Sequence, residues 1–331
     1  MNLEQRIDLM VRLGEHLVSA DPEWEQVKQH AFLNNGWFTK EFAQLAATNI
    51  AENFLQKQKL QAWAGHYHLD DNINSRNIGI VMAGNIPMVG FHDLLSVFIC
   101  GHKQNIKLSS KDDVLMKYVV SKLISLDLEA AAYFTIADNL KDLDAYITTG
   151  SNNTSRYFEY YFGKYPSIIR KNKTSVAILV GNETNDQFEK LADDICIFFG
   201  LGCRNVTKIY VPEGYNFENF LKSFSAYDYF KDHKKYRNNY DYYLTIQIMN
   251  TKFYMTNDLI IMLERDEVFS PVSQINYGFY KDKDELIRKL SSSENIQCIV
   301  GTNKLDFGKS QQPGLFDYAD GEDTMAFLLS L

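Results

Sequence analysis

The first part of the chain has apolar residues at three- and four-residue steps, which is the spacing of an amphipathic helix. This pattern predicts helices over residues 4–18, 22–34 and 37–57. A polar stretch from Asp70 to Asn77 then ends the helical region. We therefore expect a group of N-terminal helices.

From Asn77 onward, short apolar runs alternate with helical patterns. They predict strands at 78–82, 104–108, 132–136 and 144–148, and helices at 90–100 and 112–126. A second section predicts strands at 175–180, 206–211, 258–263, 271–279 and 296–300, and helices at 184–199, 216–231 and 283–291. Strands that alternate with helices are typical of βαβ units. The pattern indicates an α/β protein with parallel sheets.

Length and composition favour a globular protein. At about 150 residues per domain, 331 residues predict about two domains, and 45% apolar and 23% charged residues suit a sizeable core. The net charge of −8 argues against a broad nucleic-acid surface. The four cysteines form no C-x-x-C pair, and no apolar run is long enough to cross a membrane, so we expect a cytoplasmic protein.

Ligands of parallel sheets bind beyond the carboxyl ends of the strands, so the loops there are the first candidates. The loop after strand 78–82 contains Gly84, Asn85 and Pro87. The Asn85 amide is suited to hold an oxyanion, or alternatively only caps a turn.

Two further loops follow strands 104–108 and 144–148. Lys107, Ser109 and Ser110 are suited to bind ribose or phosphate, unless Ser110 or Asp112 only caps the next helix. Gly150 and Ser151 begin a glycine-poor loop of the kind that binds phosphate, although G-x-G-x-x-G is absent.

Cys203 follows two glycines and precedes an arginine, which favours a sharply turned backbone and a thiolate. The alternative is a buried small hydrophobe, which is how we interpret Cys100, Cys196 and Cys298.

Three weaker signals are interpreted as structural. His66 and His68 with the following aspartates suit a solvated turn better than a metal site, so no metal is expected. The Tyr/Lys segment 227–243 suits an amphipathic helix better than an RNA-binding stripe. For the pair His92–Asp93, a first-turn cap is favoured over a proton relay.

Taken in order, these loops resemble the aldehyde dehydrogenase superfamily and, more closely, its acyl-CoA reductase (LuxC) branch. The segments that carry the resemblance are 82–87 with 90–93, 107–112, 149–153 with 156–159, 199–205 and 267–272. The resemblance runs from about residue 77 to residue 321. It implies a Rossmann-type parallel-sheet cofactor domain with N-terminal helices (1–174), a smaller α/β catalytic domain (175–305) and a C-terminal segment (306–331).

The resemblance also implies a role for each position. Cys203 would be the nucleophile that forms a thioester, and Asn85 with the Cys203 N–H would form the oxyanion hole. The cofactor would be held at Lys107, Ser109, Ser110, Gly150, Ser151, Glu267 and Phe269. Since many superfamily members have an acid where Ser110 stands, NADPH is favoured, with NADH as the alternative.

Besides Ser110, two positions depart from the superfamily pattern. Ser155 replaces the last glycine of the phosphate loop, and Ile169-Arg170-Lys171 stands where the general-base glutamate is expected. The missing base should slow hydrolysis of the acyl-enzyme, which suits an enzyme that keeps the acyl group for reduction.

The resulting hypothesis is NADPH-dependent reduction of a fatty acyl-CoA to the aldehyde through an acyl-cysteine. The alternatives are an acyl-phosphate reductase or a free-aldehyde dehydrogenase on the same fold, or a non-catalytic partner of an acyl-activating protein. Expected partners are the acyl-CoA, an acyl-activating or acyl-transfer protein and further copies of the chain in a homo-oligomer, with no nucleic acid.

Overall fold

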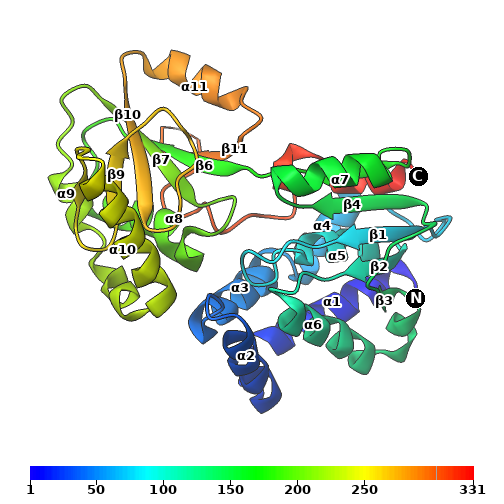
Figure 1. Ribbon diagram of the computed structural model, residues 1–331. Coiled ribbons are helices and arrows are strands. Elements are labelled where there is room, and N and C mark those ends of the chain that lie inside the picture. Colours follow the sequence, from blue (N-terminus) through cyan, green and yellow to red (C-terminus); the bar gives the residue numbers. More distant parts are fainter. Residues whose placement is uncertain (303) are drawn as a thin grey trace. The chain divides into compact units, whose positions relative to one another are not determined.

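The computed structural model describes residues 1–302 and 304–331. It divides into two compact units, which are labelled by element in Figure 1. The first unit comprises Met1–Asn172 together with Pro313–Leu331, and the second comprises Lys173–Gln312. The C-terminal segment is therefore part of the unit that contains the N-terminus.

The predicted N-terminal helices are present as α1 (Leu3–Leu17), α2 (Pro22–Asn34) and α3 (Lys40–Asn53). A fourth helix, α4 (Lys57–His66), was not predicted. The third helix begins later than expected because Thr39 caps it, accepting the N–H of Phe42 at 3.2 Å. The predicted span 37–57 thus covers a cap, a helix and a break before α4.

The first unit contains a five-stranded parallel sheet. Its strands are β1 (Asn77–Val81), β2 (Lys103–Lys107), β3 (Phe134–Ile136), β4 (Ala145–Thr149) and β5 (Ser167–Arg170), in the order β3-β2-β1-β4-β5. Its helices are α5 (Phe91–Ile99), α6 (Asp113–Leu126), the 3₁₀ turn η1 (Leu128–Ala132) and α7 (Asn152–Phe162). Figure 1 shows α7 on one side of the sheet and α1 and α6 on the other. The strand order reverses between β1 and β4, so the loops after these strands flank the switch point where such sheets bind ligands.

The second unit contains a six-stranded sheet. Its strands are β6 (Thr174–Ile178), β7 (Val206–Pro212), β8 (Met255–Thr256), β9 (Ile261–Glu264), β10 (Gln274–Tyr280) and β11 (Ile296–Val300), in the order β11-β6-β7-β10-β9-β8. Every pairing is parallel except that of β8 with β9. Its helical elements are α8 (Asn185–Cys196), η2 (Ile197–Gly200), α9 (Glu218–Lys222), η3 (Ser225–Asp232), α10 (Lys234–Met249) and α11 (Lys283–Ser291). The predicted helix 216–231 is wrong as one helix, because it is α9 followed by the 3₁₀ segment η3.

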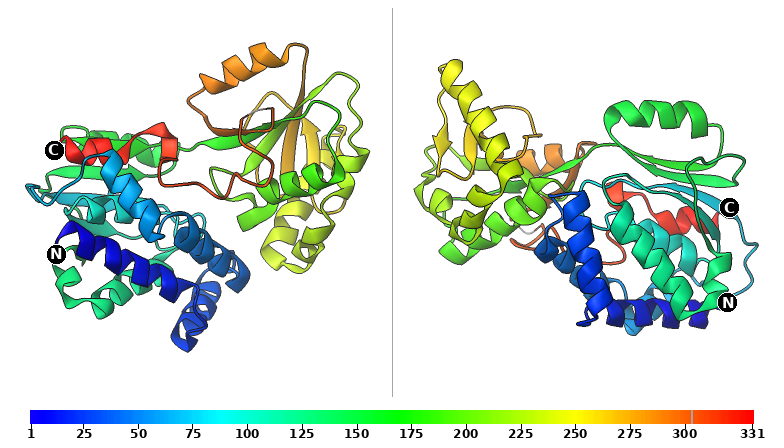
Figure 2. Two further views of the ribbon diagram at one scale, coloured as in Figure 1. Left: turned by 180° about the vertical axis from the view of Figure 1, so that it is seen from behind. Right: turned by 60° about the horizontal axis from the view of Figure 1, so that its bottom comes forward.

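The C-terminal segment, with η4 (Ala319–Gly321) and α12 (Thr324–Leu329), is held to the first unit by hydrogen bonds. Trp63 of α4 donates to the Tyr318 hydroxyl at 2.9 Å, and Arg76 donates to the carbonyl of Leu331 at 2.8 Å. Figure 2 shows this segment, in red, beside α4.

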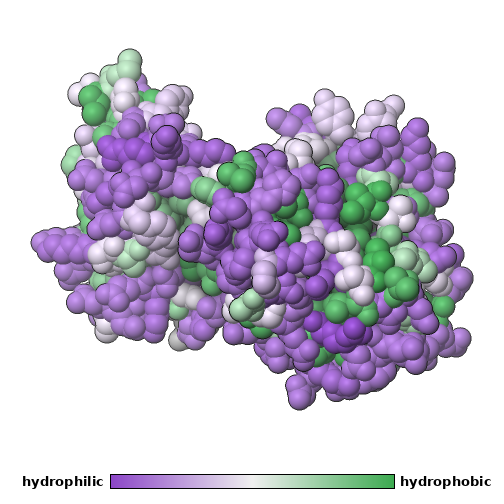
Figure 3. Space-filling model, turned by 90° about the horizontal axis from the view of Figure 1, so that it is seen from below, coloured by the Kyte–Doolittle hydropathy of each residue, from purple (hydrophilic) through white to green (hydrophobic). Residues whose placement is uncertain are grey.

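The face of the molecule in Figure 3 is mostly hydrophilic. The face in Figure 3 has hydrophobic groups interspersed among polar ones. Within the described residues, no helix combines the length and hydropathy that a membrane crossing needs. The expected α/β architecture with parallel sheets and N-terminal helices is confirmed.

Candidate active site

The turn before Cys203 has a left-handed backbone. After α8 ends, Phe198 and Phe199 have φ of 56° and Gly200 has φ of 74°. This conformation is costly for residues with a Cβ, so packing has to hold it. The Phe199 ring is buried against Phe230 and His233, each 4.4 Å between centroids. The expected sharp turn is present, and it places Cys203 half-buried just before β7.

Asn205 fastens this turn to the end of α8. Its Oδ1 accepts the N–H of Gly202 at 2.7 Å, and its Nδ2 donates to the carbonyls of Asp194, Ile195 and Ile197 at 2.9–3.3 Å. Asn205 is fully buried, so these bonds satisfy an amide that water cannot reach. The amide therefore fixes the position of the main chain on both sides of Cys203.

Ser175, at the start of β6, connects Cys203 with a second cysteine. Its hydroxyl donates to the Cys203 carbonyl at 3.1 Å and accepts the N–H of Cys298 at 3.2 Å. The Cys298 Sγ lies 2.9 Å from the same hydroxyl. Burial raises the pKa of Cys298, so this thiol stays protonated at neutral pH.

Cys100 and Cys196 are buried, as expected. Burial raises the pKa of Cys100 to about 12 and that of Cys196 well above its ordinary value. These two thiols are therefore inert, whereas Cys298, which was also expected to be buried, is half-buried like Cys203.

Glu267 and Phe269 lie in the connection between β9 and β10. Glu267 is exposed and Phe269 is half-buried. The Thr207 hydroxyl, four residues after Cys203, donates to the Val268 carbonyl at 2.6 Å. A small cavity is lined both by Phe199 and Gly200 and by the segment 270–275. The second unit thus brings together the Cys203 turn and the segment that carries Glu267.

In the first unit, the Asn85 loop packs against the loop after β2. A Cβ on Gly84 would lie only 2.5 Å from the Ser109 Oγ, so the bare glycine permits this approach. The Met88 N–H donates to the carboxylate of Asp112 at 2.7 Å. Asn85, half-buried, and Ser109, also half-buried, therefore lie on two loops in direct contact at the carboxyl edge of the sheet.

The capping alternative fails for Asp112. It stands at the N-cap of α6, but its side chain makes no capping bond, and its Oδ2 accepts the N–H of Met88 instead. Ser110 and Lys107 are exposed, and Lys107 is the last residue of β2. In the part of the chain described, no ion pair engages Lys107 or Lys111.

Gly150 and Ser151 follow β4 at the other side of the switch point. The Gly150 N–H donates to the carbonyl of Arg170 at 3.3 Å. Ser151 caps α7, its Oγ accepting the N–H of Thr154 at 3.2 Å. These two residues therefore stand at a helix N-terminus, where the helix dipole favours an anion.

A buried ion pair occupies the position where the superfamily's general base is expected. Arg170, the last residue of β5, donates to the Asp93 carboxylate at 2.6 Å and to the Thr324 hydroxyl at 2.8 Å. Both the relay and the cap interpretation of His92–Asp93 are therefore wrong. His92 instead hydrogen-bonds the Leu315 carbonyl at 3.1 Å, within a cluster of aromatic rings.

The remaining candidates have structural surroundings. His66 packs edge-on against Tyr67 and Phe316, and the described residues contain no group of three His, Cys, Asp or Glu side chains placed to hold a metal. In the segment 227–243, Lys231 pairs with Asp228 at 2.6 Å and Arg237 with Asp241 at 2.9 Å. The helical interpretation of this segment is confirmed by η3 and α10.

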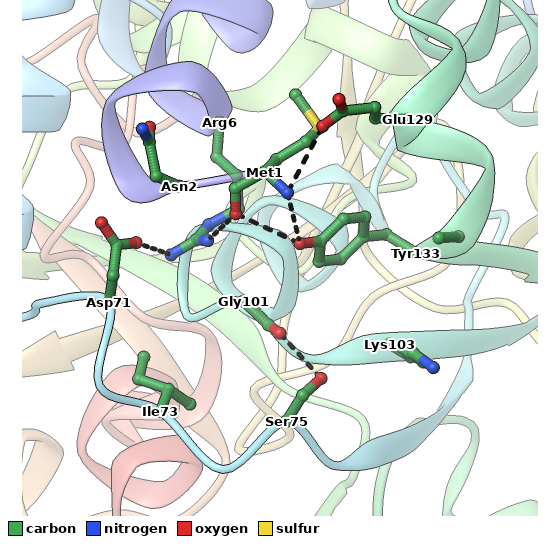
Figure 4. A pocket seen from close by; sticks show the side chains of 11 residues that line it. Met1, Asn2, Arg6, Asp71, Ile73, Ser75, Gly101, Lys103, Glu129 and Tyr133 are labelled. Atoms are coloured by element: carbon green, nitrogen blue, oxygen red, sulfur yellow. Dashed lines mark hydrogen bonds and ion pairs between the residues drawn. The ribbon is translucent and has the colours of Figure 1, made fainter.

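A cavity of about 630 Å³ lies at the amino ends of β1 and β2 (Figure 4). Most of its charged groups bind neighbouring residues of the cavity: Arg6 donates to the Met1 carbonyl at 2.8 Å and pairs with Asp71 at 3.6 Å. The Met1 amine lies 3.5 Å from the Glu129 carboxylate. Because ligands of parallel sheets bind at the opposite edge, this cluster is best explained as an anchor for α1.

The sequence interpretation missed the supporting residues. Asn205, Ser175, Lys208 and Asn276 were not identified, although the last two interrupt otherwise apolar strands. A buried lysine or asparagine in such a strand needs a partner, and this was the signal that could have found them.

The comparisons with known proteins agree with this architecture. The model of the acyl-CoA reductase (LuxC) family matches residues 73–227. Among curated proteins, no match is found. The structure is similar to an oxidoreductase from Marinobacter aquaeolei, with a TM-score of 0.66, 13% identity, and coverage of 90% of this chain and 73% of the other.

Two aldehyde dehydrogenase structures are also similar. Aldehyde dehydrogenase 21 from Physcomitrella patens, in complex with succinate, has a TM-score of 0.66 at 12% identity over 92% of this chain and 74% of the other. An NAD+ complex of an aldehyde dehydrogenase from Bacillus cereus has a TM-score of 0.61 at 12% identity over 89% of this chain and 70% of the other. Residues 73–227 thus match the acyl-CoA reductase (LuxC) family model, and the chain has the fold of the aldehyde dehydrogenase structures.

Proposed function

We propose that the protein reduces a fatty acyl-CoA to the corresponding aldehyde with NADPH, through an acyl thioester on Cys203. The observation that carries the proposal is the state of the Cys203 turn. It lies in the segment that matches the family model, Cys203 is half-buried, and Asn205 fixes its main chain. A nucleophile needs access and a fixed position, and this cysteine has both.

In the first half-reaction, the Cys203 thiolate attacks the thioester carbonyl and the CoA thiolate leaves. The carbonyl oxygen carries negative charge in the transition state, and the Asn85 amide with the Cys203 N–H would stabilise it. The acyl group is then held on Cys203 as a thioester, whose carbonyl accepts a hydride more readily than a carboxylate does.

The residues present fit a nicotinamide dinucleotide. Lys107 ends β2 as an exposed cation, Ser151 stands at the N-terminus of α7, and Glu267 is exposed beside the Cys203 turn. Lys107, Ser109 and Ser110 would bind the adenosine ribose, Gly150 and Ser151 the pyrophosphate, and Glu267 with Phe269 the nicotinamide ribose. When bound, the reduced nicotinamide would supply the hydride.

The choice of NADPH is supported by charge. The loop 107–111 has two lysines and two serines and no acid that would repel a 2′-phosphate.

At the position of the superfamily's general base, Arg170 is buried in its pair with Asp93 and cannot accept a proton from water. Slow hydrolysis of the acyl-enzyme follows, and the acyl group stays available for reduction.

The test is trapping and turnover with acyl-CoAs of increasing chain length. The wild-type protein should be labelled by a radioactive acyl-CoA, release CoA and oxidise NADPH, whereas Cys203→Ala should do none of these and still bind NADPH. Cys298→Ser is the matched control, because it removes a neighbouring thiol and should keep the labelling. Release of phosphate from an acyl phosphate, or no labelling of the wild type, would contradict the proposal.

A further inference from the structure

The connection between β9 and β10 is held by an unusual set of hydrogen bonds. The carbonyls of five consecutive residues, Arg265 to Phe269, each accept a bond from a side chain of β7 or β10. This segment, called here the Glu267 segment, belongs to neither strand. Without these side chains, its carbonyls would need hydrogen bonds from water or from another part of the main chain.

Lys208 binds the beginning of the segment. Its Nζ donates to the carbonyl of Arg265 at 2.7 Å and to that of Asp266 at 2.9 Å, and lies 4.7 Å from the centre of the Tyr210 ring. Only 3% of Lys208 is exposed. Burial lowers the pKa of Lys208, and the nearby carboxylates of Asp266 and Glu267 oppose this shift.

Asn276 binds the middle and the end. Its Nδ2 donates to the carbonyls of Glu267 and Phe269 at 2.9 and 3.0 Å. The amide can take only this orientation, because its Oδ1 accepts a bond from the Gln274 amide at 3.1 Å. Asn276 is 1% exposed, so both donors are fully committed.

Thr207 completes the set from a β-bulge. Ser175 pairs with Val206 but Val176 pairs with Lys208, so Thr207 is an extra residue in β7. In a regular strand, side chains alternate between the two faces of the sheet. The bulge interrupts this alternation, so the consecutive residues Thr207 and Lys208 both donate to the same segment. The Thr207 hydroxyl donates to the Val268 carbonyl at 2.6 Å and lies 2.6 Å from the Thr174 hydroxyl.

We propose that Lys208, Thr207 and Asn276 are positioning residues for Glu267. Their hydrogen bonds to the segment all go to its main chain: they hold the segment's carbonyls toward the sheet while the Glu267 carboxylate stays exposed, ready for the ribose hydroxyls of the cofactor. This inference rests on the proposed function. It extends the proposed function by naming three residues that hold the nicotinamide-ribose end of the site in place without touching cofactor or substrate.

The first experiment compares two lysines that line the same cavity. Lys208→Met removes both bonds to the segment, whereas Lys289→Met removes an exposed cation that makes no such bond. NADPH affinity of the free enzyme is measured by nucleotide fluorescence, and acylation of Cys203 by a radioactive acyl-CoA. For Lys208→Met we expect NADPH binding weaker by about tenfold or more and acylation within about twofold of wild type. Lys289→Met should match wild type in both, and Lys208→Arg, which keeps the charge and the donors, should recover part of the affinity.

The second experiment keeps the inference testable if Lys208→Met folds poorly. Thr207→Val removes one donor at nearly constant volume, and Thr207→Ser restores it. Hydrogen exchange over residues 265–269 should become faster in Thr207→Val, with a parallel loss of NADPH affinity, and return toward wild type in Thr207→Ser. Unchanged exchange and unchanged NADPH affinity in both Lys208→Met and Thr207→Val would overturn the inference. Labelling of wild-type Cys203 tests the proposed function separately, so either can fail without the other.

Discussion

The carboxylate of Asp112 accepts the main-chain N–H of Met88 at 2.7 Å, and this bond joins the two loops that carry Asn85 and Ser109. Met88 has a φ of 54°, so the bond also stabilises a residue in the left-handed region. Asp112 is 3% exposed and its second oxygen, Oδ1, has no partner. Burial raises the pKa of Asp112 well above the ordinary value of an aspartate.

This raised pKa predicts that the folded protein loses stability as the pH rises. Above about pH 4 the unfolded chain releases the Asp112 proton while the folded protein keeps it, so the folded state binds more protons and loses stability as the pH rises toward the folded pKa. Asp112→Asn keeps an acceptor for Met88 and removes the titration. Its free energy of unfolding should therefore rise relative to wild type by up to about 1.4 kcal/mol per pH unit within this window. Urea denaturation at several pH values measures the difference, and a constant difference would contradict the assignment.

The close approach at Gly84 predicts a steric effect. In Gly84→Ala the new methyl group would lie 2.5 Å from the Oγ and 2.7 Å from the Cβ of Ser109, so the two loops must separate. We expect a loss of about 1–3 kcal/mol in the free energy of unfolding. Adding Ser109→Gly removes both obstructing atoms and should recover most of it. Gly65→Ala is the control: nothing lies within 4 Å in α4, so it should be neutral or stabilising by up to about 1 kcal/mol.

The buried ion pair between Arg170 and Asp93 predicts that substitutions at these two residues have strongly non-additive effects on stability. Removing either partner leaves an uncompensated charge in a site where Arg170 is 3% exposed, so Arg170→Met and Asp93→Leu should each cost about 3–5 kcal/mol. The double variant leaves no unpaired charge and should be more stable than the sum of the two losses predicts. A double-mutant cycle by chemical denaturation measures this. Additive losses would show that the pair contributes no coupling energy.

The difference between what the sequence predicted and what the structure adds has a physical cause. Apolar periodicity predicted α11 over 283–291 with no error, and β1, β2 and β4 within one residue, because burial on a helix or sheet leaves a local pattern. It also led to Cys203 and Asn85, since both follow recognisable turns. The partners of Asn205, Lys208 and Asp112 are distant carbonyls and N–H groups, which every residue carries. No local pattern marks them, so these contacts required the fold.

The surroundings of the four cysteines predict their order of alkylation. Cys100 and Cys196 are buried with raised pKa values, and Cys298, although half-buried like Cys203, has a pKa raised by burial and lies beside the Ser175 hydroxyl. Cys203 is half-buried on a turn. Since the thiolate reacts and needs access, iodoacetamide at pH 7.5 should modify Cys203 first, with one equivalent incorporated before the others react. Peptide mass spectrometry over time measures this, and in urea all four thiols should react at similar rates. If Cys298 reacted as fast as Cys203 in the folded protein, the Ser175 contact would not protect it and the assignment of a single reactive thiol would be wrong.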